Sequence, residues 1–133
     1  MSPRKKLHVS LFDMACVSHV AHGLWIAEDN NRRRFNELGF WTVLECDLET
    51  HGFVFADWAG NPSDDPAWAG AYLDRIERTV ERDKNHPSVV VWSLGNEAGT
   101  GRNLAAMADW VHGRDPSRPV HYEGDHSCSY TDL

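Results

Sequence analysis

Polar side chains able to do acid–base chemistry or bind a metal follow three short apolar segments of this chain. The segments span residues 40–46, 88–94 and 119–123, and the polar residues at or after their ends are Glu45, Asp47, Glu49, His51, Asn96, Glu97 and Glu123. In parallel α/β folds, active groups collect at the carboxyl ends of the strands. Carboxylates placed there can act as general acids and bases. The alternative interpretation is that each is a solvated loop acid of an acidic protein.

Two of these residues have the spacing of metal ligands. Glu49 and His51 are two residues apart, so in an extended loop their side chains point the same way. Glu97, after the next apolar segment, can supply a third ligand. Two carboxylates and one imidazole suit a hard divalent cation completed by water, such as Mg²⁺ or Mn²⁺. Zinc is less favoured because no further His or Cys joins the set.

The elements that must position these residues alternate along the chain. The three apolar segments read as buried strands, and between them lie two amphipathic segments. We expect one helix from Pro66 to Lys84, capped by Asp65, and a second through Leu104 and Val111. A further helix is expected over 32–38, ended by Gly39. The order strand–helix–strand–helix–strand predicts parallel neighbouring strands, in either a doubly wound sheet or a (β/α) barrel.

Length and charge narrow the class of protein. The chain has 133 residues, one domain's length, whereas a complete eight-fold barrel needs about 250. Its net charge of -7 argues against nucleic acid as a partner, and no apolar run reaches the length of a membrane span. Three widely spaced cysteines without a CxxC pair favour a reducing, cytoplasmic location. GxSxG, Walker, GxGxxG and HExxH motifs are all absent from the sequence.

The ordered series of motifs resembles the β-galactosidases of glycoside hydrolase family two. The motifs are Glu49-Thr-His-Gly-Phe53, Asp64-Asp-Pro-Ala-Trp68, Val80-Glu-Arg-Asp-Lys-Asn-His-Pro-Ser-Val89, Trp92-Ser-Leu-Gly-Asn-Glu-Ala-Gly99 and Asp115-Pro-Ser-Arg-Pro-Val-His-Tyr-Glu-Gly124. They cover about residues 35–133, in order and with family-like spacing. The resemblance implies a partial (β/α)8 TIM barrel of class α/β, with about three parallel strands and two connecting helices.

The resemblance also implies a chemistry. It makes the chain part of an enzyme that hydrolyses terminal β-galactosides, such as lactose, with retention of configuration. Glu97 corresponds to the general acid/base, and Asn96 corresponds to a residue that contacts the substrate near its 2-hydroxyl. Glu49, His51 and Glu97 correspond to the ligands of a catalytic Mg²⁺, for which Mn²⁺ is the alternative. His19, in Ser18-His-Val-Ala21, corresponds only loosely to a further substrate contact.

The chain also departs from the family. Residues 1–31 look unlike it, so we expect an atypical and poorly ordered segment over 1–31 and a partial barrel domain over 32–133. The family's nucleophile is a Glu on a later strand, so we expect the isolated chain to be inactive. The alternative is a non-catalytic fragment that binds metal or associates with itself or with a complementary chain. A metal-dependent hydrolase of another class would need a ligand or nucleophile that the sequence does not supply.

Overall fold

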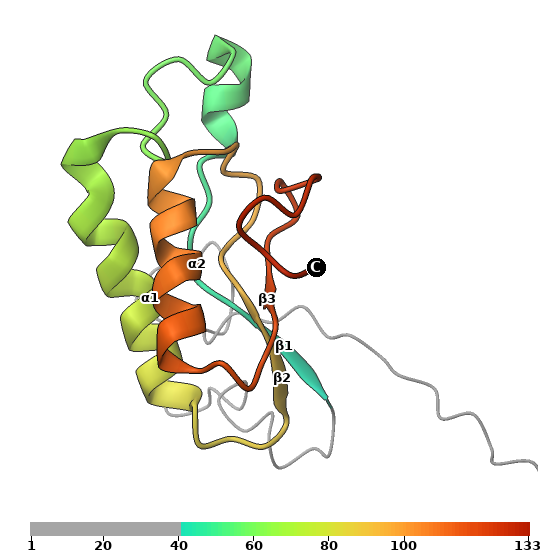
Figure 1. Cartoon of the computed structure of the whole chain (residues 1–133). Helices are drawn as coiled ribbons and strands as arrows, with labels where there is room; N and C mark the ends of the chain where they lie inside the picture. The colour runs from blue at the N-terminus through green and yellow to red at the C-terminus, as the bar shows by residue number, and fades with distance from the viewer. Residues whose placement is uncertain (1–40) are drawn as a thin grey trace, which may run out of the picture.

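The computed structural model describes residues 41–133, which form three strands and two α-helices (Figure 1). In chain order the elements are β1 (Thr42–Glu45), the 3₁₀ helices η3 (His51–Ala56) and η4 (Pro66–Trp68), α1 (Ala69–Asp83), β2 (Val89–Ser93), α2 (Arg102–Arg114) and β3 (Val120–His121). The helix expected over 32–38, Gly39 and His19 lie outside the described residues. Within the described residues, no helix has the length and apolar character needed to span a membrane.

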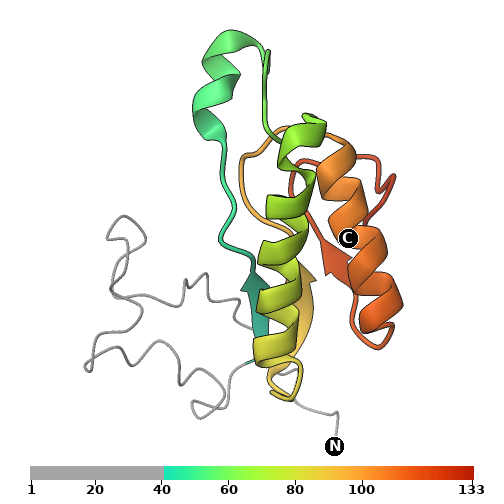
Figure 2. The ribbon, with the colours of Figure 1, turned by 90° about the vertical axis from the view of Figure 1, so that its left-hand side faces the viewer.

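The strands form one parallel sheet in the order β1-β2-β3, as the alternating pattern predicts. The register places Leu44 beside Trp92, and Trp92 beside Val120. Both α-helices cover the same face of the sheet (Figures 1 and 2). A doubly wound sheet carries helices on both faces, whereas a (β/α) barrel carries them on its outside alone. The parallel sheet with its two connecting helices confirms the predicted class α/β, and helices on one face are what part of a (β/α) barrel requires.

The hydrophobic core lies between the sheet and the two helices. Leu44, Trp92 and Val120 share the face that the helices cover, and Trp92 and Val120 are fully buried. The helices contribute a matching apolar stripe, consisting of Tyr72, Ile76, Val80, Leu104, Met107, Ala108 and Val111. Burial of each valine, leucine, isoleucine or methionine side chain in this stripe stabilises the fold by roughly 1.5–3 kcal/mol relative to exposure. The layer holds the strands in one register and so aligns their carboxyl ends.

The predicted capping residue of the first helix is confirmed, but the first turn after the cap is not α-helical. Asp65 accepts a hydrogen bond from the Ala67 N–H over 2.9 Å, with Pro66 in the first position. The turn from Pro66 to Trp68 is a 3₁₀ helix, so the α-helix starts at Ala69 rather than at Pro66. The helix ends at Asp83, one residue before the expected Lys84. Pro87 lies just beyond and disfavours further helix.

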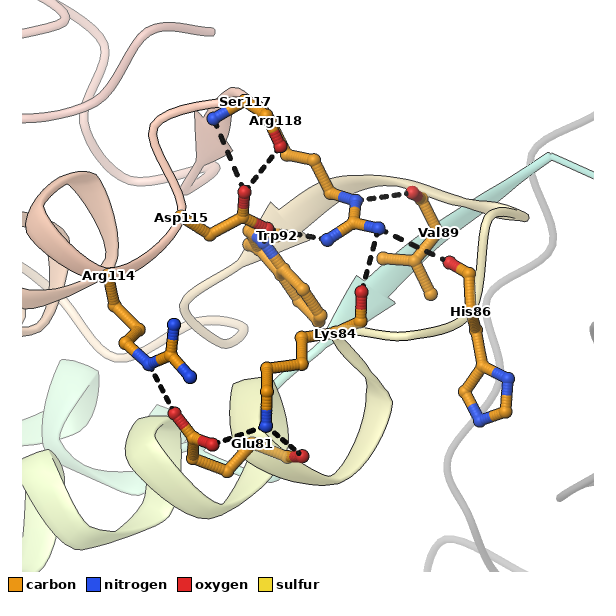
Figure 3. A network of polar contacts seen from close by, with 9 residues as sticks. All are labelled: Glu81, Lys84, His86, Val89, Trp92, Arg114, Asp115, Ser117 and Arg118. Carbon is orange, nitrogen blue, oxygen red and sulfur yellow. Dashed lines mark hydrogen bonds and ion pairs between the residues drawn. The ribbon is translucent and has the colours of Figure 1, made fainter.

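A polar network closes the amino-terminal end of the sheet (Figure 3). The Arg118 guanidinium donates to the backbone carbonyls of Val89, Lys84 and His86, and lies 5.4 Å from the Trp92 ring centroid. Asp115 accepts hydrogen bonds from Arg118, from Ser117 and from the Trp92 indole N–H. Burial alone would raise the pKa of Asp115, but these donors outweigh it and hold that pKa at about 2.

A buried carboxylate organises the chain after β3. Asp125 is 4% exposed and accepts hydrogen bonds from the backbone N–H groups of Ser129, Tyr130 and Thr131. Burial opposes the charge, yet these donors lower the pKa of Asp125 well below its usual range. The polar tail after Gly124 contains neither helix nor strand, and the hydrogen bonds to Asp125 fix its path.

Candidate active site and metal centre

The structure brings Glu49, His51 and Glu97 together beyond the carboxyl ends of β1 and β2. One ligand atom from each lies within 4.8 Å of those of the others, and all three residues are exposed. His51 Nδ1 lies 2.9 Å from Glu97 Oε2. These distances suit one cation, because a bound divalent metal places its oxygen ligands about 2.0–2.6 Å away and exposed side chains can adjust. The donor set therefore fits a hard divalent ion completed by water.

Main-chain pairing continues past the strands and aligns the two loops that carry these ligands. Glu49 and Asn96 form a parallel bridge, in which the Asn96 N–H donates to the Leu48 carbonyl over 2.9 Å. Gly95 makes this approach possible. A Cβ at Gly95 would lie 2.6 Å from the Leu48 carbonyl oxygen, and its φ of +148° suits glycine. The loops meet at the site because a residue without a side chain lies between them.

Glu97 has a left-handed backbone conformation, with φ of +40°. For a residue other than glycine this costs of order 1–3 kcal/mol and persists where neighbouring contacts determine it. One such contact is the Glu97 N–H, which donates to Glu123 Oε1 over 2.9 Å. Another is on the next residue, Ala98, whose N–H donates to the Tyr122 hydroxyl over 2.9 Å. The strain is thus held by residues at and after the end of β3.

The carbonyl of Ala98 is held from the opposite side by the loop between η3 and η4. It accepts hydrogen bonds from Asn61 Nδ2 over 2.7 Å and from the Ser63 hydroxyl over 2.6 Å. Both donors are buried, and the Ser63 hydroxyl also contacts the Tyr72 hydroxyl at 3.0 Å. Sequence reasoning missed Asn61 and Ser63, because polar residues in a loop carry no spacing that marks them as supports. It also missed Tyr122, which lies in the apolar segment 119–123.

A row of polar side chains crosses the other face of the sheet beside the site. The register places Glu45, Ser93 and His121 side by side, on the face opposite the core residues. The Ser93 hydroxyl lies 3.0 Å from Glu45 Oε2 and 3.4 Å from His121 Nδ1. Burial raises the pKa of Glu45; the Ser93 hydrogen bond opposes this, and the nearby charges of Glu123 and Glu49 add to it. In a closed barrel this face points inward.

Two further residues predicted from the sequence, Asn96 and Asp47, lie outside the ligand trio. Asn96 is half-buried between Gly95 and Glu97 and takes part in the main-chain bridge. Asp47 lies apart from the trio and contacts Arg75 of α1 through both its carbonyl and its carboxylate. The connection between β1 and α1 contains a short helix, η3, that the sequence pattern did not predict. This helix begins at His51, and its Phe55 lies edge-on to the imidazole, with ring centroids 6.0 Å apart.

Comparison with known proteins gives one consistent result. Residues 29–133 match the model of a family described as "Glycosyl hydrolases family 2, TIM barrel domain". A β-galactosidase of Arthrobacter sp. (strain B7) is 76% identical over 90 residues, which are 68% of this chain and 9% of that protein. A β-galactosidase of Pectobacterium atrosepticum is 43% identical over 109 residues, or 82% of this chain and 10% of that protein. The chain thus spans about a tenth of these curated relatives.

Proposed function

The chain belongs to the family 2 glycosyl hydrolases, within their TIM-barrel domain, and on this premise we propose that it carries the acid/base half of a β-galactosidase active site. The substrate class is a terminal β-galactoside such as lactose, as the names of the relatives suggest. The observation that carries the proposal is the convergence of Glu49, His51 and Glu97 beyond two neighbouring strands. A reducing, cytoplasmic location belongs to the same proposal, supported by the free thiols of Cys46 and Cys128.

Glu97 is proposed as the general acid/base. It protonates the glycosidic oxygen as the bond breaks, and then deprotonates the water that releases the sugar. Its position supports this role, because its carboxylate is exposed while its backbone is held by Glu123. Asn96 is proposed to contact the sugar near its 2-hydroxyl. His19, which lies outside the described residues, stays a proposed substrate contact. The nucleophilic carboxylate of a retaining enzyme, about 5–5.5 Å away, is proposed to come from the rest of the barrel.

Glu49, His51 and Glu97 are proposed to hold Mg²⁺, or Mn²⁺ in its place. Bound there, the ion supplies positive charge that stabilises developing negative charge. The chain's own contribution is to orient Glu97: His51 approaches one oxygen of its carboxylate, and the Glu49–Asn96 bridge fixes the spacing of the two loops. An assay of Mn²⁺ binding by electron paramagnetic resonance tests this. We expect His51→Ala and Glu49→Gln each to weaken binding by tenfold or more, whereas Asp109→Asn, on the exposed face of α2, leaves it unchanged.

A chimaera tests the catalytic role. The segment of this chain that matches the Arthrobacter β-galactosidase replaces its counterpart there, and Glu97→Gln is compared with the Asp109→Asn control. We expect Glu97→Gln to lower turnover of nitrophenyl galactoside about 10²–10⁴-fold. Dinitrophenyl galactoside, whose leaving group needs little protonation, should still form the glycosyl-enzyme, and azide should restore turnover because it attacks without a base. Equal loss for good and poor leaving groups, without azide rescue, would refute the assignment.

A non-catalytic role in association is the second candidate. Within residues 41–133, β1 pairs with β2 alone and so has a second edge available for pairing, whereas the outer side of β3 is covered at Val120, whose N–H and carbonyl form hydrogen bonds with Asp132 and Leu133. We propose that the free edge of β1 pairs with a complementing fragment or with another copy of the chain. Light scattering at micromolar concentration should then show species larger than the monomer, and a fragment carrying further barrel strands should reduce them. Monomers alone in light scattering would contradict this second candidate.

A further inference from the structure

The structure assigns to Asn61 a positioning role: its carboxamide joins the loop that carries Glu49 and His51 to the loop that carries Glu97. This inference rests on the metal site proposed above. Asn61 lies in the connection between η3 and η4 and is 6% exposed. Asn61 is not one of the three proposed ligands. Among the described residues, its side-chain hydrogen bonds join it to Thr50, Ser63 and Ala98, not to a ligand carboxylate or to the imidazole.

The two ends of the carboxamide hold the two loops. Asn61 Oδ1 accepts a hydrogen bond from the Thr50 hydroxyl over 2.8 Å. Its Nδ2 donates to the Ala98 carbonyl over 2.7 Å. Thr50 stands between Glu49 and His51 in the sequence, and Ala98 directly follows Glu97. Each end of the Asn61 carboxamide therefore forms a hydrogen bond with a residue adjacent to a proposed ligand.

This second tie restricts a motion that the backbone bridge alone permits. The Asn96 N–H to Leu48 carbonyl bond joins the loops just before the ligands. One such connection leaves the loops free to rotate about it, whereas a second connection beyond it removes that freedom. The ligand side chains are exposed, so their placement depends on the backbone that carries them. Loops fixed in advance lose less entropy when a cation binds, which strengthens binding.

The chemistry of the position requires an amide. One oxygen must accept from the Thr50 hydroxyl while one nitrogen donates to the Ala98 carbonyl. A carboxylate lacks the donor, and an aliphatic side chain lacks both groups. Ser63 and Tyr122 also hold Ala98, but their hydrogen bonds do not reach the Thr50 side. Apart from the contact between the ligands His51 and Glu97 themselves, Asn61 is thus the described side chain whose hydrogen bonds connect the two loops.

Four variants of the 133-residue chain test the role through Mn²⁺ affinity, measured by electron paramagnetic resonance. Thr50→Val keeps the shape but removes the hydroxyl donor, and Asn61→Leu removes both polar ends without adding charge. We expect each to weaken Mn²⁺ binding about tenfold. Thr50→Ser restores the hydroxyl and should bind within twofold of the unmodified chain. Asn103→Leu is the matched control, since Asn103 is another buried asparagine, which donates to the Pro62 and Asp65 carbonyls instead.

The double variant Thr50→Val with Asn61→Leu separates a shared connection from general destabilisation. If both residues act through one link, the double variant should bind about tenfold more weakly, not a hundredfold. Circular dichroism confirms that each variant is folded, and if Asn61→Leu fails to fold, Thr50→Val against Thr50→Ser decides. The inference is overturned if Thr50→Val binds like the unmodified chain, or if Thr50→Ser or Asn103→Leu loses as much affinity as Thr50→Val.

A metal-free measurement keeps this inference distinct from the metal proposal. In ¹⁵N-labelled chain, Thr50→Val should shift the backbone amide resonances of Glu97 and Ala98 more than Thr50→Ser does, because the Asn61 carboxamide relays the change. If the unmodified chain fails to bind Mn²⁺, the metal proposal is refuted and these resonances alone decide the role of Asn61. Amides of Glu97 and Ala98 that do not move in Thr50→Val would overturn it.

Discussion

Trp92 on β2 donates its indole N–H to Asp115, which directly follows α2, over 2.9 Å. The bond ties the central strand to the end of a helix at the edge of the sheet opposite the candidate site. It also gives the half-buried Asp115 carboxylate a donor that cannot exchange for water without moving the largest side chain of the core. The network around Asp115 therefore makes the stability of the fold depend on pH.

Asp115→Asn should destabilise the protein at neutral pH and flatten its acid unfolding. A carboxyl whose pKa is lowered from 3.8 to about 2 contributes stability above pH 3.8, which is lost as the pH falls through about 2. The expected contribution is about 2 kcal/mol. Urea unfolding between pH 2 and 7 measures it as the difference between variant and unmodified chain, with Asp109→Asn as the control for lost charge. If the free energy of unfolding changed with pH in the same way in Asp115→Asn and in the unmodified chain, the prediction would be wrong.

Gly95→Ala should disrupt the site and the fold together. The added Cβ would meet the Leu48 carbonyl at 2.6 Å in a backbone conformation that side chains rarely adopt. We expect a loss of more than about 2 kcal/mol in the free energy of unfolding. Gly113→Ala is the control, since it lies in α2 with nothing within 4 Å of the new Cβ, and should gain roughly 0.5–1 kcal/mol. Denaturant unfolding measures the free energy of unfolding of both variants. Equal changes in Gly95→Ala and Gly113→Ala would contradict the prediction.

Glu45→Gln should stabilise the protein at neutral pH. Burial, with the charges of Glu123 and Glu49, outweighs the Ser93 hydrogen bond and raises the pKa of Glu45, so the folded state disfavours its charge. That cost appears as the pH rises from 4.5 through the raised pKa and persists above it. Glutamine keeps an acceptor for the Ser93 hydroxyl. The gain in the free energy of unfolding should be present at pH 7 and should vanish near pH 4; a gain of the same size at both pH values would contradict this explanation.

Glu123→Gln should retain turnover in the chimaera, whereas Glu123→Ala should lower it. Glu123 Oε1 accepts from the Glu97 N–H, a task that a glutamine oxygen can also perform. We expect the turnover of Glu123→Gln to lie within about fivefold of that of the parent chimaera. The turnover of Glu123→Ala should be lower by tenfold or more, which corresponds to the loss of about one hydrogen bond to the site. Steady-state hydrolysis of nitrophenyl galactoside measures both. Complete loss in Glu123→Gln would instead indicate that this carboxylate reacts with the sugar.

The alternation of apolar segments with amphipathic ones was enough to predict the sheet, its parallel order and the two helices. It also indicated that Glu49, His51 and Glu97 converge, because the carboxyl ends of neighbouring parallel strands lie at one edge. The strands are shorter than the apolar segments: β1 ends at Glu45 within 40–46, and β3 has two residues, Val120 and His121. Pairing, which sequence patterns do not show, decides where a strand stops.

The supports of the site could not be predicted in the same way. Asn61 and Ser63 lie in a polar loop, and their value comes from meeting Ala98, which is distant in the sequence. The short helix η3 was missed because residues 51–56 are too few for a helical period. Such contacts depend on the path of the folded backbone, and a single sequence carries no pattern that reports it.

The parallel register has a further consequence for how this protein can fail. Because successive residues of a strand face opposite ways, a slip of one residue in β2 would exchange Trp92 in the core for Ser93 in the polar row. The same slip would carry Asn96 and Glu97 away from Glu49. A chain that folds with the wrong alignment therefore cannot keep an intact metal centre, and Mn²⁺ binding would serve as an assay of correct folding during refolding or expression.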